Sequence, residues 1–305
     1  MPADAYGPGH AFLARDELLA FDEIETIARA AVSLGVDKLR LTGGEPLLRP
    51  GLDELVERLA KIEGVRDLAL TTNGSLLARR AHALARAGLR RVTVSLDALD
   101  PVTFARMSGA GARLGDVLEG IAAARDAGLG PLKINMVVRR GANDACIEEM
   151  ARHFHGSGAA LRFIEYMDVG SCNRWSRAEV VSGAEIVRRV DAVLPLEPVG
   201  GTHGEVATRY RYRDGGGEIG VITSVTKPFC GDCVRGRLAA DGAFYTCLFA
   251  TSGHELRPLV RGGANADAIA ERLAAIWGDR ADRYSELRAS LPVVAGKVEM
   301  SRVGG

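Results

Sequence analysis

The segment that decides the fold is residues 38–46, which read KLRLTGGEP. Over its first five residues, polar side chains alternate with leucines, as on a strand that has one polar and one apolar face. The two glycines and the proline then predict a turn. Apolar residues at helical spacing lie on both sides, from Ile24 to Val32 and again near residues 52–61. A strand between two helices predicts βαβ units with parallel strands.

The same alternation continues to about residue 167. Further strands are predicted near residues 67–72, 91–96, 132–138 and 160–167, and further helices near residues 76–87, 101–127 and 144–155. After Gly170 the rhythm breaks; the later predictions are a helix near 183–192, a hairpin through 206–224, and helices near 265–277 and 280–290. We therefore expect an α/β protein with two domains, residues 1–170 and 171–305, the first built on a parallel sheet, open or closed into a barrel.

The composition is that of an ordinary soluble globular protein. Of 305 residues, 47% are hydrophobic and 26% are charged, and 39 basic residues balance 39 acidic ones. Nothing global suggests a nucleic acid or an anionic membrane as partner, so an anion site must come from local placement of basic residues. The chain has no apolar run near the roughly 20 residues that span a bilayer, and no signal-peptide pattern at Met1. We expect a cytoplasmic protein.

Polar residues share one face of each predicted strand. In a βα architecture the crossover helices cover the outer face, which must be apolar, so the polar face points inward. Four basic residues then converge on one interior: Lys38, Arg40, Lys133 and Arg162. Unpaired cations there are costly, and a polyanion such as a triphosphate would satisfy them. The alternative is an internal ion-pair network with Asp97 and Glu165. From the second domain, Arg235 and Arg237 would cover the same cavity.

The cysteines suggest a metal centre in the second domain. Cys230, Cys233 and Cys247 have the spacing C-x2-C-x13-C, which is too close for three independent core residues. The spacing alone fits either zinc, with His254 or His203 as a fourth ligand, or an iron–sulfur cluster with one open iron. Elsewhere in the chain, Cys146 is expected to be a buried small hydrophobe.

These pieces, in this order, resemble the MoaA-type GTP 3′,8-cyclases, radical S-adenosylmethionine enzymes that open molybdenum-cofactor synthesis. The resemblance is carried by residues 38–46, 70–74, 94–98, 162–170, 222–224, 229–238, 241–242, 247–249 and 304–305. It runs from about residue 12 to the last residue. The turn Gly43–Pro46 is shared by many radical S-adenosylmethionine enzymes, whereas the cysteine and arginine pattern and the double-glycine tail are specific to this family.

The resemblance implies a fold and a set of site residues. The fold is a partial (βα)6 barrel followed by a C-terminal α+β iron–sulfur domain. S-adenosylmethionine would be held through Gly44, Ser95 and the backbone near Met167, and the GTP phosphates would meet Arg40, Lys133, Arg162, Arg235 and Arg237, with Thr71 and Lys38 close by. The three cysteines would hold a 4Fe–4S cluster whose open iron binds guanine, which favours iron over zinc. The tail Gly304-Gly305 would reach the active site.

The resemblance also implies the reaction and its partners. GTP would be cyclised to (8S)-3′,8-cyclo-7,8-dihydroguanosine 5′-triphosphate, with a reductant as electron donor, cyclic pyranopterin monophosphate synthase acting next, and a homodimer as a possible assembly. The family's second 4Fe–4S cluster sits on a C-x3-C-x2-C loop that this chain lacks, and no strand precedes the first helix. We therefore expect the chain as written to bind GTP without cyclising it. The other hypotheses are a catalytically silent nucleotide-binding protein and a zinc-containing barrel hydrolase.

Overall fold

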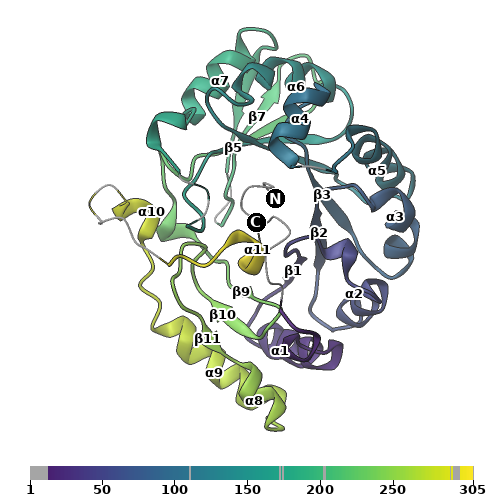
Figure 1. Ribbon diagram of the computed structural model, residues 1–305, viewed down its shortest axis with the longest axis vertical. Helices are drawn as coiled ribbons and strands as arrows, with labels where there is room; N and C mark the ends of the chain where they lie inside the picture. Colours follow the sequence, from purple (N-terminus) through teal and green to yellow (C-terminus); the bar gives the residue numbers. More distant parts are fainter. Residues whose placement is uncertain are drawn as a thin grey trace.

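One large sheet organises the protein (Figure 1). The computed structural model describes residues 13–109, 111–171, 173, 175–201, 204–288, 290 and 296–304. The sheet has eight strands in the order β1-β2-β3-β4-β5-β8-β7-β6. Their bounds are β1 Lys38–Leu41, β2 Asp67–Thr72, β3 Arg91–Ser95, β4 Lys133–Val138, β5 Ala160–Glu165, β6 Leu196–Val199, β7 Thr208–Tyr212 and β8 Glu218–Ile222.

Six strands of this sheet run parallel. Each of β1 to β4 pairs in parallel with the next strand, and β5 pairs in parallel with β8. Only β7 and β6 join antiparallel. The sheet curves, and a layer of helices lies on its outside (Figure 1). Helix α1 Phe21–Ser33 precedes β1, and the helices that follow are α2 Leu52–Ala60, α3 Leu77–Arg86, α4 Pro101–Ser108, α5 Leu114–Asp126, α6 Ile147–Phe154 and α7 Gly183–Asp191. This is an α/β, TIM-like partial barrel, as the sequence predicts.

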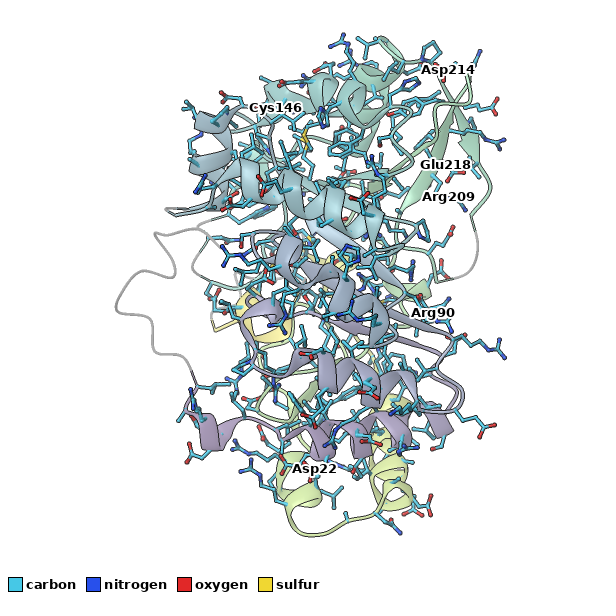
Figure 2. The ribbon with its side chains drawn as sticks, turned by 90° about the vertical axis from the view of Figure 1, so that its right-hand side faces the viewer. Asp22, Arg90, Cys146, Arg209, Asp214 and Glu218 are labelled. Atoms are coloured by element: carbon cyan, nitrogen blue, oxygen red, sulfur yellow. The ribbon has the colours of Figure 1, made fainter. Side chains whose placement is uncertain are left out.

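The apolar face of the strands packs outward under the helices. On β3, Val92 and Val94 are 0% exposed, and on β4 Ile134 and Met136 are also 0% exposed. Each such side chain contributes about 1.5–3 kcal/mol when it is removed from water. Cys146 belongs to the same core, at 8% exposure within the helical layer (Figure 2), which confirms its prediction as a buried small hydrophobe. The opposite, polar face of the strands is thereby left to line the interior.

The single helix predicted over residues 101–127 is wrong, because the structure has two. Asp100 caps α4, its carboxylate accepting a hydrogen bond of 2.7 Å from the Thr103 amide, and Pro101 occupies the first helical position. The helix ends at Gly109, whose φ of +87° lies in the left-handed region that favours glycine. The apolar spacing gave no sign of this break.

The sheet extends beyond the predicted boundary near residue 171. The predicted hairpin is confirmed as β7 and β8, and β8 continues the barrel by pairing with β5. The division into residues 1–170 and 171–305 stays a prediction. Strand β8 nevertheless places residues of the second half inside the same sheet.

Residues 237–278 form a small layer beside β1 (Figure 1). A second sheet has the order β11-β10-β9, with β9 Arg237–Leu238, β10 Ala243–Tyr245 and β11 His254–Glu255. Its helices are α8 Arg257–Arg261 and α9 Ala266–Gly278, and α10 Tyr284–Leu287 and α11 Met300–Val303 follow in the chain. The predicted helix over 280–290 is therefore too long. The described residues also form five short 3-10 helices: η1 Arg15–Glu17, η2 Pro46–Leu48, η3 Asp144–Cys146, η4 Arg177–Glu179 and η5 Cys230–Asp232.

Helix α9 packs against α1, so residues 266–278 lie beside residues 21–33. Ile27 on α1 and Ile269 and Leu273 on α9 share one apolar cluster, each at most 4% exposed. At the edge of this cluster, Arg261 lies 2.9 Å from Glu23. Among the described residues, no helix is both long enough and apolar enough to cross a membrane.

Candidate functional site

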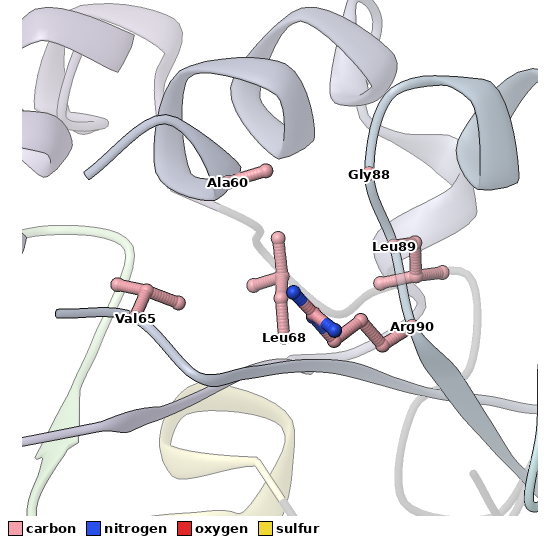
Figure 3. Close-up of a pocket in the computed structure, with 6 residues that line it drawn as sticks. All are labelled: Ala60, Val65, Leu68, Gly88, Leu89 and Arg90. Carbon is pink, nitrogen blue, oxygen red and sulfur yellow. The ribbon is translucent and has the colours of Figure 1, made fainter. Parts of the chain in front are cut away.

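A hollow on the outside of the sheet lies at the wrong end for a site. It is lined by Ala60, Val65, Leu68, Gly88, Leu89 and Arg90, where β2 and β3 begin (Figure 3). Ligands of parallel α/β sheets bind at the carboxyl ends of the strands or between them, because turns and helix N-termini meet there. The side chain of Arg90, on the flank of the molecule (Figure 2), makes a useful control position.

The inner face of the sheet carries a row of hydrogen-bonded polar groups. Arg40 on β1 donates to the Thr71 hydroxyl at 2.8 Å and to the Thr93 hydroxyl at 3.2 Å. Side chains of three adjacent strands therefore hold one guanidinium on the inner face of the curved sheet. We call the space on this side of the sheet the lumen. On the far side, Arg162 of β5 donates from Nε to the Asn135 carboxamide oxygen at 3.0 Å. Both arginines keep further donors for a ligand.

A glycine makes room for the second of these arginines. A Cβ at Gly220 on β8 would lie 3.1 Å from Cγ of Arg162, closer than most real Cβ contacts. The parallel pairing of β5 with β8 sets Arg162 opposite Gly220. The stem of Arg162 therefore crosses the bare backbone of β8, and any larger residue at 220 would push it away.

The basic residues of the lumen are close enough to disturb one another. Burial, together with the charges of Arg40 and Arg91, lowers the pKa of Arg162 to about 10. Burial likewise lowers the pKa of Lys133 to about 8, with Arg162, Arg91 and Arg40 adding to the effect. Each cation makes protonation of its neighbours less favourable. The lumen therefore has a strong positive potential, and a bound anion would stabilise it.

The internal ion-pair network with Asp97 and Glu165 is wrong. Among the described residues, neither carboxylate forms a salt bridge with these cations. Glu165, 0% exposed, accepts hydrogen bonds from the amides of Gly183 at 2.7 Å and Val225 at 2.8 Å. Asp97 accepts one from the Val137 amide at 2.8 Å, and burial raises its pKa to about 6. Both are occupied by backbone donors that the strand pattern could not reveal.

The acidic residue that does face the cations is Asp67, at the start of β2. It pairs with Arg91 of β3, whose Nε lies 2.7 Å from Oδ1. Arg91 was missing from the predicted set, although it has the same strand parity as Thr93 and that parity would have found it. The floor of the lumen thus holds an ion pair, and Arg40, Lys133 and Arg162 above it have no carboxylate salt bridge among the described residues.

The arginines beside the cysteines extend this positive surface. The guanidinium of Arg235 is one cause of the lowered pKa of Arg40, after burial and Arg91, so residues far apart in sequence come near each other. Burial lowers the pKa of Arg237 to about 10, and Arg235 adds to this. Lys38 shares the inward parity of Arg40 and is exposed to solvent at the edge of the sheet.

The three predicted cysteine ligands lie in one neighbourhood. The thiols of Cys233 and Cys247 both act on the pKa of Arg237, and Cys230 acts on that of Cys247. Arg235 Nη2 lies 3.5 Å from the sulfur of Cys233, and the Phe249 amide donates to the sulfur of Cys247 at 3.4 Å. Hydrogen bonds of this kind stabilise thiolates that hold iron–sulfur clusters.

Individual thiols differ in their surroundings. Burial raises the pKa of the Cys233 thiol, but the charge and hydrogen bonds of Arg235, together with Arg280, outweigh it, so the pKa falls below its ordinary value. Burial raises the pKa of Cys247. Across the described ranges, no three His, Cys, Asp or Glu side chains are grouped so as to hold a single metal ion. The suggested zinc ligand His254 is exposed on β11, and His203 lies outside the described residues.

The predicted cofactor residues lie where strands end. Gly44 and Ser95 are exposed at the carboxyl ends of β1 and β3. Glu45 ties the first of these ends to the next strand, accepting from the Thr72 hydroxyl at 2.7 Å and the Asn73 amide at 2.8 Å. After β5, the carbonyl of Met167 accepts from the Asn173 side chain at 3.2 Å. The Glu45 contacts join the turns after β1 and β2, and the Met167 contact lies within the loop after β5. We call these carboxyl ends of the strands the rim.

The C-terminal segment reaches this rim. Helix α11 lies inside the ring of strands (Figure 1), and a Cβ at Gly304 would collide with the side chain of Thr42, just past β1. Gly304 is buried, with a φ of +68° that favours glycine. Its neighbour Gly305, also predicted as a site residue, lies outside the described residues.

Comparisons with known proteins agree with this architecture. A model of the Radical SAM superfamily matches residues 8–154, and a model named Molybdenum Cofactor Synthesis C matches residues 159–286. A protein of Xanthomonas axonopodis pv. citri named GTP 3′,8-cyclase is 53% identical, covering 100% of this chain and 91% of that protein.

Two other relatives carry the same name. The one from Acidothermus cellulolyticus is 54% identical over 95% of this chain and 81% of its own length. The one from Staphylococcus aureus is 41% identical over 100% of this chain and 91% of its own length. Identity at these levels along the whole chain shows the family. The chain belongs to the GTP 3′,8-cyclase family.

Proposed function

We propose that the protein carries out the reaction for which its family is named. GTP is cyclised in a radical S-adenosylmethionine-dependent step to (8S)-3′,8-cyclo-7,8-dihydroguanosine 5′-triphosphate, which opens molybdenum cofactor biosynthesis. The observation that carries the proposal is the positive lumen. Arg40, Lys133 and Arg162 face it from three strands, and Arg235 reaches Arg40 from the cysteine segment. A triphosphate supplies the negative charge that such a lumen stabilises.

In this proposal, Arg40, Lys133, Arg162, Arg235 and Arg237 bind the three phosphates. Thr71 orients Arg40 through its 2.8 Å hydrogen bond, so the guanidinium is placed before GTP arrives. Lys38 stands at the open edge of the lumen and contributes charge without a fixed contact. Because these donors are held by strands, the ribose and base of GTP are positioned along with the phosphates.

The cysteines fit a 4Fe–4S cluster. Cys230, Cys233 and Cys247 would hold three irons, and the Arg235 and Phe249 donors to two of the sulfurs suit thiolate ligands. The fourth iron, lacking a protein ligand, would offer a Lewis-acid position for guanine. Arg235 and Arg237 follow this segment closely, so the same loop would hold base and phosphates in register.

The rim at the strand ends fits S-adenosylmethionine. Gly44, Ser95 and the backbone near Met167 would hold it, and Glu45 keeps the first turn in place. When reduced, this cofactor supplies the radical that removes a hydrogen atom from the substrate. The protein's own part is to hold the ribose below the rim and to keep water from it, with Gly304 beside Thr42 closing one side.

Calorimetric titration with GTP tests the substrate assignment. Arg40→Ala should weaken binding by about 1.5–3 kcal/mol, the range for a hydrogen bond to a charged group. Arg90→Ala removes an exposed arginine outside the lumen and should leave binding unchanged. Equal affinity in both variants would refute the assignment. In the source organism, deletion of the gene should abolish the molybdenum cofactor, and a gene copy should restore it.

A further inference from the structure

A buried lysine connects the C-terminal segment to the rim of the site. Lys297 is 8% exposed and its Nζ donates to Asp168 Oδ2 at 2.6 Å and to the Tyr284 hydroxyl at 2.5 Å. The Tyr284 hydroxyl in turn donates to Asp168 at 2.5 Å. Asp168 is itself 8% exposed and follows Met167 directly. A charge so deeply placed needs its partners, because desolvation is costly without them.

The partners of Lys297 belong to the other parts of the site. The Tyr284 ring stacks on Phe249, with ring centroids 4.8 Å apart, and the Phe249 amide donates to the sulfur of Cys247. Arg288 lies 2.8 Å from the second oxygen of Asp168. One buried group of side chains therefore touches the loop after β5, the cysteine loop and the C-terminal segment.

The segment after Lys297 makes further contacts along its length. The Val298 amide donates to the Ala250 carbonyl at 3.0 Å, and Glu299 accepts from the Ser171 amide at 2.8 Å. Arg302 pairs with Asp241, with a side chain that is 44% exposed. Asp241 is itself buried, and Val303, at 4% exposure, packs in an apolar cluster with Ala239, Ala243 and Tyr245. Lys297 is the only charged side chain in residues 296–304 that is itself buried, so its pairing with Asp168 anchors the start of the segment.

We propose that Lys297 is a positioning residue, which docks the C-terminal segment on Asp168 and thereby seats Gly304 against Thr42. Without the ammonium, Asp168 keeps Arg288 and Tyr284 as partners, and residues 298–304 lose their buried anchor. The rim at β1 then opens. The consequence for catalysis rests on the proposed function, whereas the docking itself does not.

Hydrogen exchange of the full chain, followed by mass spectrometry, tests the docking. The amides of Val298, Val303 and Gly304 are hydrogen-bonded and report on it. Lys297→Met should speed their exchange about tenfold or more, since a charged hydrogen bond is lost. Lys297→Arg keeps the charge and should restore slow exchange. Lys61→Met, on an exposed i,i+4 pair, is the control and should change nothing.

A second variant covers the case in which Lys297→Met fails to fold. Asp168→Asn combined with Lys297→Met and Arg288→Met removes all three charges of the buried group, so none of them is left uncompensated. It should fold and show the same fast exchange of residues 298–304. Slow exchange of that segment in either variant, with the rest of the protein folded, would overturn the proposal.

Kinetics separate docking from the proposed function. Lys297→Met should lower kcat for cyclisation, while KM for GTP changes less than about twofold, because the phosphates contact other residues. A rise in KM with unchanged kcat contradicts a positioning role. If the unmodified protein does not bind GTP, the proposed function fails, and the exchange experiment still decides the docking.

Discussion

Replacing Arg162 by alanine should weaken GTP binding and leave the free protein no less stable. Arg162 lies on β5 and reaches the lumen over Gly220. Its loss removes one charged donor to a phosphate, worth about 1.5–3 kcal/mol, so Kd should rise about 10- to 100-fold. In the absence of GTP the same guanidinium repels Arg40 and Lys133 and is one cause of the lowered pKa of Lys133.

The two effects have opposite signs, which makes the test sharp. Isothermal titration at pH 7 and low ionic strength gives Kd, and denaturant unfolding of the same samples gives the free energy of unfolding. Relief of repulsion should offset the lost hydrogen bond to Asn135, so the free energy of unfolding should change by less than about 1 kcal/mol. Arg90→Ala is the matched control. Unchanged GTP affinity in Arg162→Ala, or a large loss of stability without GTP, would show that this arginine is structural.

Three further outcomes are expected. GTP affinity should be constant from pH 7 to about 8 and fall above that, because Lys133, with its pKa of about 8 in the free protein, must be protonated to bind phosphate; titrations in Lys133→Gln should show no such fall, and a parallel fall in that variant would refute the assignment. After anaerobic reconstitution, iron and acid-labile sulfide should be bound; Cys247→Ser should lose them readily and Cys146→Ala should not, whereas stoichiometric zinc without sulfide would contradict the cluster. Gly304→Ala should displace the end of the chain from Thr42, so carboxypeptidase should remove residues faster than from the unmodified protein; equal rates would mean that the close contact is not maintained in solution.

The strand pattern predicts the lumen well because its cause is local. Alternation along β1 sends Arg40 to one face and Leu41 to the other, whatever the rest of the chain does. The same rule places Lys133 and Arg162, and it would have placed Arg91 had every inward position been read. Inward-facing residues of parallel strands can therefore be assigned from the sequence pattern, without knowing the tertiary structure.

Contacts between distant segments could not be predicted in this way. The strand pattern places Glu165 near the inward-facing cations. Its carboxylate nevertheless accepts hydrogen bonds from the amides of Gly183 and Val225, which reach it only when distant loops fold back onto β5. Arg280 donates to the Cys233 carbonyl from a separate part of the chain. Lys297 and Asp168 are likewise far apart in sequence. Each pairing depends on how loops pack, and neither periodicity nor spacing records that.

The parallel pairing of β8 with β5 has a consequence for protein engineering. Chimeras between relatives are usually joined where one domain ends and the next begins, which for this chain suggests residue 171. A junction there would split a ladder in which Arg162 of one parent must cross Gly220 of the other. Exchanged parts should instead begin after Ile222, so that both strands, and the arginine with the space it needs, come from a single parent.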